Sequence, residues 1–250
     1  MKVDVYSNMY NEEVIVPYWL RHYETIADRI FVWEDDSTDS TKELLSRHPK
    51  VTFLPMAKHG DDDGYWTTEL FPQYEKYSRG QADWVIIADA DEFIYHPHLL
   101  DVLRQEKEKG TQIIQCAGYT MISEKLPTTA GQIYDEIKLG LPDGMESKWT
   151  IHSPDITIRF GRGRHGPVHN HGAYVRDRHT GIKLLHYRYF GDENYENHDK
   201  KILERNRMVF HFTKEYSRQE PRTLPDKTRG SALDWFAAHK AEATNVVDPI

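Results

Sequence analysis

The chain has 250 residues, enough for one large domain or two small ones with a sizeable core. Apolar residues make up 38% and charged residues 29%, which is typical of a soluble globular protein and excludes a disordered chain. A net charge of -8 argues against general nucleic-acid binding.

The first hundred residues alternate strand patterns with helix patterns. Strands are predicted over 2–9, 29–34, 51–56 and 83–90. Helices are predicted over 11–26, 41–48 and 64–80, the second capped by Ser37, Thr38 or Asp39 and the third broken at Pro72. Strands and helices that alternate at this length predict a parallel sheet.

After about residue 110 the pattern loosens. Strands are predicted over 111–122, 155–160 and 182–190, with Gly- and Pro-rich loops between them and a short helix over 231–243. We find no internal repeat, no low-complexity tract and no clear linker, so a single α/β domain with a mixed second half is the simplest organisation.

The ends of the chain and its one cysteine bear on location. No apolar run is long enough for a transmembrane helix, and no secretion signal follows Met1. Cys116 is the only cysteine, so an intramolecular disulfide is impossible and a buried thiol is expected. These features predict a cytoplasmic protein without a membrane span.

Polar side chains follow three of the predicted strands. They occupy 8–12 after the first strand, 35–39 after the second and 89–92 after the fourth. The carboxyl ends of parallel strands meet at one edge of a sheet, where ligands of such folds bind. The three groups are therefore expected to form one site.

Asp89 and Asp91 flank Ala90 at the end of a strongly apolar strand. Residues two apart in an extended strand point the same way. Two carboxylates on one side suit Mn2+ or Mg2+, which prefer oxygen ligands and leave positions open for phosphate. The alternative is a helix-capping or solvated acidic turn.

Three segments in this order, "SNMYNEE", "EDDSTDST" and "IIADADEF", resemble the nucleotide-sugar-binding half of a GT-A glycosyltransferase, close to family 2. A weaker likeness lies in "HYRYFG". The resemblance implies a GT-A-type α/β fold, with a mostly parallel central sheet, flanking helices and a looser second half. It implies a nucleotide-sugar-binding half over 1–110, an acceptor-binding half over 111–215 and a C-terminal extension over 216–250.

The resemblance also implies nucleotide contacts. Asn8 and Tyr10 would hold the base and ribose, with Glu12 in the same group, and Asp35 would accept a hydrogen bond from uracil or another base. Glu34 stands where the family motif has Asp, and Asp36 where it has Gly, which leaves the base preference open.

For the metal, Asp89 would approach the ribose and the ion, and Asp91 would ligate Mn2+ or Mg2+ at the diphosphate. A late His186 would complete the ligand shell, and Arg188 would face the same diphosphate. His186 can instead be an ordinary strand histidine. A rival chelating pair is His169 with His171, while His165, beside Arg162 and Arg164, is interpreted as a phosphate or acceptor contact.

An inverting transferase needs a general base for the acceptor hydroxyl. The resemblance favours an acid pair between the Asp-x-Asp and the late histidine, and Asp135 with Glu136 is the nearest match. Their alternative is an ordinary surface turn. The other acids in this interval are Glu124, Glu146 and Asp155.

Two loops complete the sequence interpretation. Residues 161–166 fit Gly-x-Gly-x-x-Gly, but "PVHNHGAYV" after them has no helical periodicity, which argues against a dinucleotide site. Their positive charge suits either an anionic ligand or plain solvent exposure. Residues 58–66 form a polar loop that either moves over the donor or is simply exposed.

The sequence therefore predicts a metal-dependent glycosyltransferase that moves a sugar, with inversion, from a UDP-linked donor to a hydroxyl of a glycan or other acceptor. One alternative is a metal-dependent phosphoesterase, which usually needs two metals about 4 Å apart and more ligands. Another is a relative that binds sugar or nucleotide without catalysis.

Overall fold

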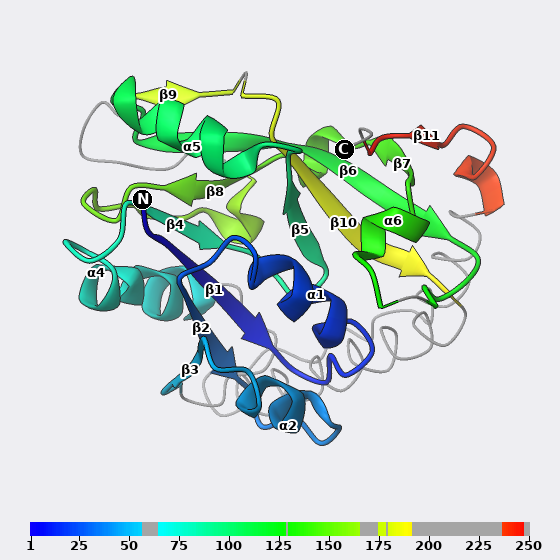
Figure 1. Ribbon diagram of the computed structural model, residues 1–250, viewed down its shortest axis with the longest axis horizontal. Helices are drawn as coiled ribbons and strands as arrows, with labels where there is room; N and C mark the ends of the chain where they lie inside the picture. Colours follow the sequence, from blue (N-terminus) through cyan, green and yellow to red (C-terminus); the bar gives the residue numbers. More distant parts are fainter. Residues whose placement is uncertain (57–64, 129, 166–174, 179, 192–236, 248–250) are drawn as a thin grey trace, which may run out of the picture.

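The computed structural model describes residues 1–56, 65–128, 130–165, 175–178, 180–191 and 237–247. Its first half is a parallel sheet in the order β3-β2-β1-β4 (Figure 1). These strands are β1 (Val3–Met9), β2 (Arg29–Glu34), β3 (Val51–Leu54) and β4 (Trp84–Ile87). The helices between them include α1 (Val16–Tyr23) and α2 (Thr41–Ser46). All four predicted strands are confirmed.

The second half extends this sheet with strands of mixed direction. β8 (Lys148–His152) lies antiparallel between β4 and β6 (Ile113–Ser123), and β10 (Lys183–Phe190) runs parallel to β6 and antiparallel to β5 (Glu92–Tyr95). Further elements after β5 include α5 (Leu99–Glu108), α6 (Ile133–Glu136), β7 (Leu139–Pro142), β9 (Arg176–Asp177) and β11 (Thr244–Asn245). The expected α/β class with a mixed second half is confirmed.

Alternating side chains of the strands feed two cores, one on each face of the sheet. Val3 and Val5 pack with Trp19 of α1 on one face. Tyr6 points the other way and packs with Phe71. Figure 1 shows α1 beside β1 and β5, where the Tyr23 hydroxyl donates to the Glu92 carbonyl at 2.9 Å.

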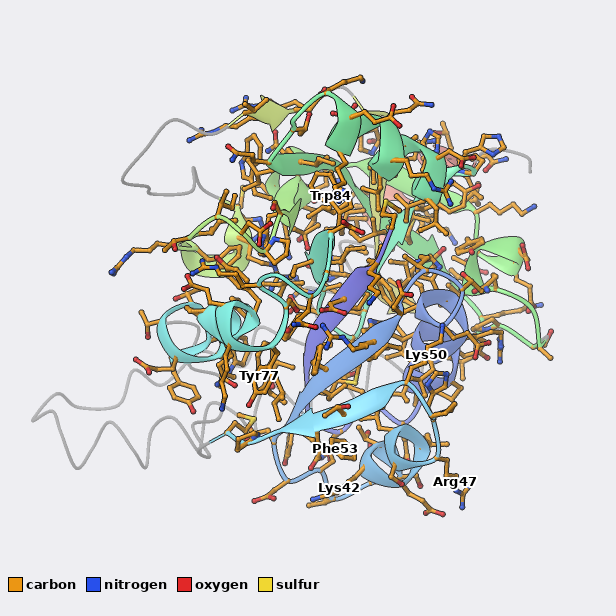
Figure 2. All side chains as sticks on the ribbon, turned by 60° about the vertical axis from the view of Figure 1, so that its left-hand side comes forward. Lys42, Arg47, Lys50, Phe53, Tyr77 and Trp84 are labelled. Carbon is orange, nitrogen blue, oxygen red and sulfur yellow. The ribbon has the colours of Figure 1, made fainter. Side chains whose placement is uncertain are left out.

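The helical stretch after β3 is broken where the proline predicts. A π-helical turn (Trp66–Leu70) is followed by a 3-10 turn (Phe71–Gln73) and then by α4 (Tyr74–Tyr77). Pro72 lacks an N–H, so a regular helix cannot continue through it. Figure 2 views this side of the molecule, with Tyr77 labelled and Phe53 on the edge strand β3.

The strand predicted over 155–160 is wrong. Ile156, Ile158 and Phe160 are buried in alternation, as a strand would bury them. Their backbone, however, is bound by a side chain: the Tyr74 hydroxyl donates to the Ile156 carbonyl at 2.7 Å and accepts from the Ile158 N–H at 2.9 Å. A period-2 pattern reports extended, half-buried chain, whether or not a neighbouring strand pairs with it.

The C-terminal part docks on the second half of the sheet. A helical turn at 237–239 precedes β11, which pairs with β7, and Val246 is buried. Cys116 of β6 is buried as expected and is in register with Lys148 of β8. In the parts of the chain that the structure describes, no helix has the length and hydrophobicity needed to span a membrane.

Candidate active site

The strand order reverses between β1 and β4, and the polar groups predicted from the sequence follow these strands. The second half of the chain adds β8 antiparallel to β4 and β10 antiparallel to β5. β8 therefore begins beside the carboxyl end of β4, and His186 lies in register with Glu92. β4, β8 and β10 thus converge with the loops after β1 and β2 at the switch point, where ligands of open α/β sheets bind.

The nucleotide-contact residues predicted after β1 and β2 are buried. Asn8 and Tyr10 are each less than a tenth exposed, as is Asp35, whose N–H donates to the Met9 carbonyl at 3.0 Å. Among the described residues, the Asn8 Oδ1 atom is buried without a hydrogen-bond partner. A buried acceptor without a donor costs about 1–3 kcal/mol, which a ligand N–H here would recover.

Glu12 lies in the loop after β1, half-buried, and its N–H donates to the Thr41 hydroxyl at 2.6 Å. The neighbouring loop contains Asp36, at φ 53°. This left-handed region favours glycine, which the motif that this segment resembles has at that position, although aspartate tolerates it better than most residues. The departure from the motif therefore keeps the backbone conformation that glycine would take.

Asp89 is held by a buried arginine. Both terminal nitrogens of the Arg164 guanidinium donate to its carboxylate, Nη1 to Oδ1 at 3.2 Å and Nη2 to Oδ2 at 3.0 Å. The Asp89 side chain is still 38% exposed, whereas that of Arg164 is 2% exposed. Arg164 ends a short 3-10 turn (Arg162–Arg164) at φ 59°. Its positive charge is thus used within the protein rather than being exposed to solvent.

Glu92 is the third acid after the apolar strand β4, and it has a role inside the protein. Its carboxylate is fully buried and bound on every side: Oε2 accepts from Arg164 at 2.7 Å and from the Asp89 N–H at 3.0 Å, and Oε1 accepts from Lys148. Burial raises the pKa of Glu92, but the charges of Lys148 and Arg164 outweigh it and hold the pKa at about 2. Glu92 is an internal anchor, not a ligand-binding acid.

Asp91 faces His186 across the site. The His186 Nε2 atom lies 3.1 Å from Asp91 Oδ2, and its Nδ1 atom lies 3.1 Å from Glu146 Oε2. Burial lowers the pKa of His186, and the two carboxylates more than reverse this, raising it to about 10. The imidazole is therefore protonated in this arrangement.

Lys148 connects the two halves of the cluster. Besides Glu92, its Nζ atom lies 3.3 Å from Glu146 Oε2, and its side chain is 6% exposed. Burial lowers the pKa of Lys148, but the neighbouring acids raise it above its usual value. Burial likewise raises the pKa of Glu146, but His186 and Lys148 hold it at about 2.

Seven side chains of alternating sign therefore form one connected series, which we call the charge chain. It begins at one aspartate of the Asp-x-Asp and ends at the other. In order of contact, its members are Asp89, Arg164, Glu92, Lys148, Glu146, His186 and Asp91.

The Asp91–His186 pair can hold a divalent cation only when the imidazole releases the proton that it shares with Asp91. Ligands at 2.0–2.1 Å in octahedral geometry put neighbouring donors about 3 Å apart, and these two atoms are already 3.1 Å apart as an ion pair. Within the described ranges no group of three or more His, Cys, Asp or Glu side chains can enclose an ion. Mg2+-type sites often use one or two protein ligands and complete the shell with phosphate and water.

The other predicted site residues differ in where they lie. Arg188 is half-buried on β10, but the register of β10 against β6 shifts between His186 and Tyr189, which breaks the simple alternation that relates it to His186. His169 and His171 lie outside the described residues, as does most of the loop over 58–66.

The two acids predicted to supply the general base, Asp135 and Glu136, are the last two residues of α6, and both side chains are exposed. The Asp135 carboxylate accepts from the Gln132 N–H at 2.9 Å and caps the helix. The Glu136 carboxylate accepts from the N–H and hydroxyl of Thr128 at 2.9–3.0 Å. Of the five acids considered from the sequence, the structure brings Glu146 into the charge chain.

Sequence reasoning missed Lys148 and the role of Arg164. The available signal was a lysine at the start of the apolar strand pattern "KWTIH", since a lysine is almost never fully buried unless it is paired. Nothing in the sequence identifies its partners, because Glu92 lies 56 residues away.

No protein-family model and no curated protein matches this sequence. Among solved structures, S. aureus TarS 1-349 has a TM-score of 0.46 at 14% identity, over 95% of this chain and 79% of that one. Its complex with UDP-GlcNAc has a TM-score of 0.43 at 14% identity, over 96% and 78%. Glucosyl-3-phosphoglycerate synthase from Mycobacterium tuberculosis with Mn2+ and UDP-glucose has a TM-score of 0.34 at 17% identity, over 48% and 43%. Similarity at this level does not decide the function.

Proposed function

We propose that this protein is a metal-dependent glycosyltransferase of the GT-A type, related to family 2, that transfers a sugar from a UDP-linked donor to an acceptor hydroxyl with inversion. The observation that carries the proposal is the Asp91–His186 pair at the spacing of neighbouring metal ligands, with Asp89 presented beside it at the switch point of the sheet. We assign residues 1–110 to the donor, 111–215 to the acceptor and 216–250 to an extension.

The donor would lie across the ends of β1, β2 and β4. Asn8 supplies a buried oxygen that lacks a partner among the described residues, and Asp35 a buried carboxylate, and together they suit the N–H groups of a base. Tyr10 and Glu12 lie at the same edge, toward the ribose. Asp89 keeps lone pairs beyond those that Arg164 uses, and its exposed side suits the ribose hydroxyls.

Asp91 and the deprotonated imidazole of His186 would hold Mn2+ or Mg2+, the ion taking the place of the proton between them, and Asp89 would lie close to it. When bound there, the ion would supply Lewis-acid stabilisation of the negative charge on the leaving diphosphate. Arg188, if its guanidinium faces the same group, adds a second fixed positive charge there. The chain's own contribution is to keep these groups in place before the donor arrives.

The acceptor hydroxyl must lose its proton as it attacks the anomeric carbon, and we assign this step to Asp135 or Glu136. Replacing the base by its amide should lower kcat by about 100-fold to 10,000-fold and leave UDP affinity unchanged. Asp135→Asn and Glu136→Gln are therefore assayed for kcat, for UDP binding and for thermal unfolding. Loss of stability alone would reduce both acids to the local roles described above.

The first test is calorimetric titration of UDP and GDP, with and without Mn2+, into the wild type, Asp91→Ala and the control Asp101→Asn. Asp101 is an exposed acid paired with Arg104 on α5. Loss of a residue that only hydrogen-bonds to a metal ligand lowers affinity by about 10-fold to 100-fold, so loss of a ligand itself should lower it further. We expect UDP binding that needs Mn2+ and Asp91, and is unaffected by Asp101→Asn.

Three results would change the assignment. Nucleotide binding that ignores both Mn2+ and Asp91 would overturn the metal site. Metal-dependent binding without transfer to any acceptor would indicate a binding protein that keeps the fold. No nucleotide binding, together with release of phosphate from phosphoesters, would indicate the phosphoesterase, although the described residues contain no group of three or more metal-ligating side chains for it.

A further inference from the structure

The charge chain has a centre that lies away from both aspartates. Lys148 is its fourth member, three contacts from either end. One arm runs through Glu92 and Arg164 to Asp89, and the other through Glu146 and His186 to Asp91. A single lysine therefore connects to both acids of the Asp-x-Asp by two separate routes.

Lys148 is placed to act on these acids but not on the donor itself. Its ammonium contacts two carboxylates, of which Glu92 is fully buried, and its own side chain is 6% exposed. The ends of the charge chain are open instead, with Asp89 at 38% and Asp91 at 25% exposure. A ligand can therefore contact Asp89 and Asp91, whereas Lys148 is enclosed by the protein.

Stability alone does not explain such a series. Buried ion pairs are often no more stabilising than apolar side chains of similar volume, because desolvation offsets their attraction. The arginine in this series also adopts a φ of 59°, an unfavourable value for a residue with a Cβ. What the series does provide is a fixed position for each carboxylate, since both oxygens of Asp89 and one of Asp91 are held from the protein side.

We propose that Lys148 is a positioning residue that sets Asp89 and Asp91 for donor and metal binding, acting through Glu92 and Glu146. This rests on the proposed function. In that role its removal should weaken metal-dependent nucleotide binding even in a variant whose stability has been restored.

The design uses a matched pair of changes. Lys148→Met keeps the length of the side chain and removes the charge, which leaves the buried Glu92 with Arg164 but without Lys148 and should lower the unfolding temperature. Adding Glu92→Gln removes the opposite charge and should recover most of that loss. Lys107→Met is the control, because Lys107 pairs with Asp83 on the surface, outside the charge chain. Lys148→Arg tests conservative rescue.

In the double variant we expect UDP affinity in the presence of Mn2+ to fall at least about 10-fold, the scale on which partners of metal ligands act. UDP affinity without Mn2+ should change little, and KM for the donor should rise more than kcat falls. Lys148→Arg should recover part of the affinity, and Lys107→Met should match the wild type in every assay. A stable double variant with wild-type, Mn2+-dependent UDP affinity would overturn the proposal.

A crystal structure of the double variant separates this inference from the proposed function. If the wild type itself shows no Mn2+-dependent nucleotide binding, the proposed function fails, and the positions of the two carboxylates still decide the role of Lys148. Displacement of Asp89 or Asp91 by about 1 Å or more supports positioning, since shifts of that size are enough to impair a site. Unmoved carboxylates overturn it.

Discussion

The parallel half of the sheet carries a buried acid near each of its two ends, and the two are built differently. Near the amino end, Asp4 is fully buried and bound by Arg29 at 2.5 and 2.9 Å and by the Ser78 hydroxyl at 2.5 Å. These partners come from β2 and from the end of α4, and the Asp4 carboxylate is closed to solvent. At the carboxyl end, the charge chain runs through the protein and opens at both aspartates. A buried acid thus indicates a site only where its network leads outward.

The backbone shows the same contrast. At the amino end, left-handed turns before β4 and β6 use Gly80 and Gly110. At the carboxyl end Gly163 takes such a conformation too, but so do Asn11, Asp36 and Arg164, the positive-φ residues other than glycine in the described part of the chain. Strain of this kind persists where the surrounding contacts impose it, which is common at functional sites.

The strongest test of this contrast compares the two arginines. Arg164→Ala takes one of two cations from the fully buried Glu92 and removes both hydrogen bonds that Arg164 donates to Asp89, so we expect a loss of about 3–5 kcal/mol in the free energy of unfolding. The side chain of Arg29 is 41% exposed, so in Arg29→Ala water can take its place beside Asp4. This variant should therefore lose much less unfolding free energy. Urea denaturation of both variants measures the difference. Equal losses would contradict the comparison.

A second change separates stability from binding. Asp4→Asn removes the charge from the closed cluster and weakens its hydrogen bonds, which are worth about 1.5–3 kcal/mol when a charged group takes part. We expect a loss in that range and no change in Mn2+-dependent UDP affinity. The measurement is urea denaturation beside calorimetry, and weakened nucleotide binding in a fully folded Asp4→Asn protein would show that the two ends are coupled.

Acid should destabilise the protein through two histidines outside both networks. Burial lowers the pKa of His22 to about 3 and of His152 to about 4, so both are neutral when folded. In the unfolded chain they take up protons below about pH 6.5. Their stabilising contribution is therefore complete above pH 6.5 and is lost as the pH falls toward 4, by at most about 1.4 kcal/mol per pH unit for each.

The slope of unfolding free energy between pH 6.5 and 4.5 checks this. His152→Phe, which suits the aromatic contacts of His152 with Tyr74 and Phe160, should reduce the slope. A slope identical to that of the wild type would mean that His152 is already protonated in the folded protein.

The smallest expected effect concerns the strained backbone. Asp36→Gly places at φ 53° the residue that accepts this conformation most readily. Relief of strain and the greater freedom of an unfolded glycine oppose each other, so the free energy of unfolding should change by no more than about 0.5–1 kcal/mol. Thermal unfolding measures it, with Asp36→Ala as the comparison. Asp36→Ala should be the less stable of the two, and the reverse order would contradict the strain argument.

The strands and the carboxyl-edge acids could be predicted because both follow local rules. Apolar runs such as 83–90 mark buried strands, and parallel strands bring their ends together. The charge chain could not be predicted, because Lys148 reaches Glu92 only once β8 has inserted beside β4. The strand expected over 155–160 failed for a related reason, since the Tyr74 hydroxyl that binds this backbone lies about 80 residues earlier.

The lone thiol offers a means to follow these strands without any mutation. Cys116 is fully buried, burial raises its pKa, and it lies in register with Lys148 at the pairing of β6 with β8. A thiol reagent can reach it only when that pairing opens, so the rate of labelling under native conditions measures the free energy of opening. Ligands that tighten the charge chain should slow the labelling, which turns one inert sulfur into a read-out of binding.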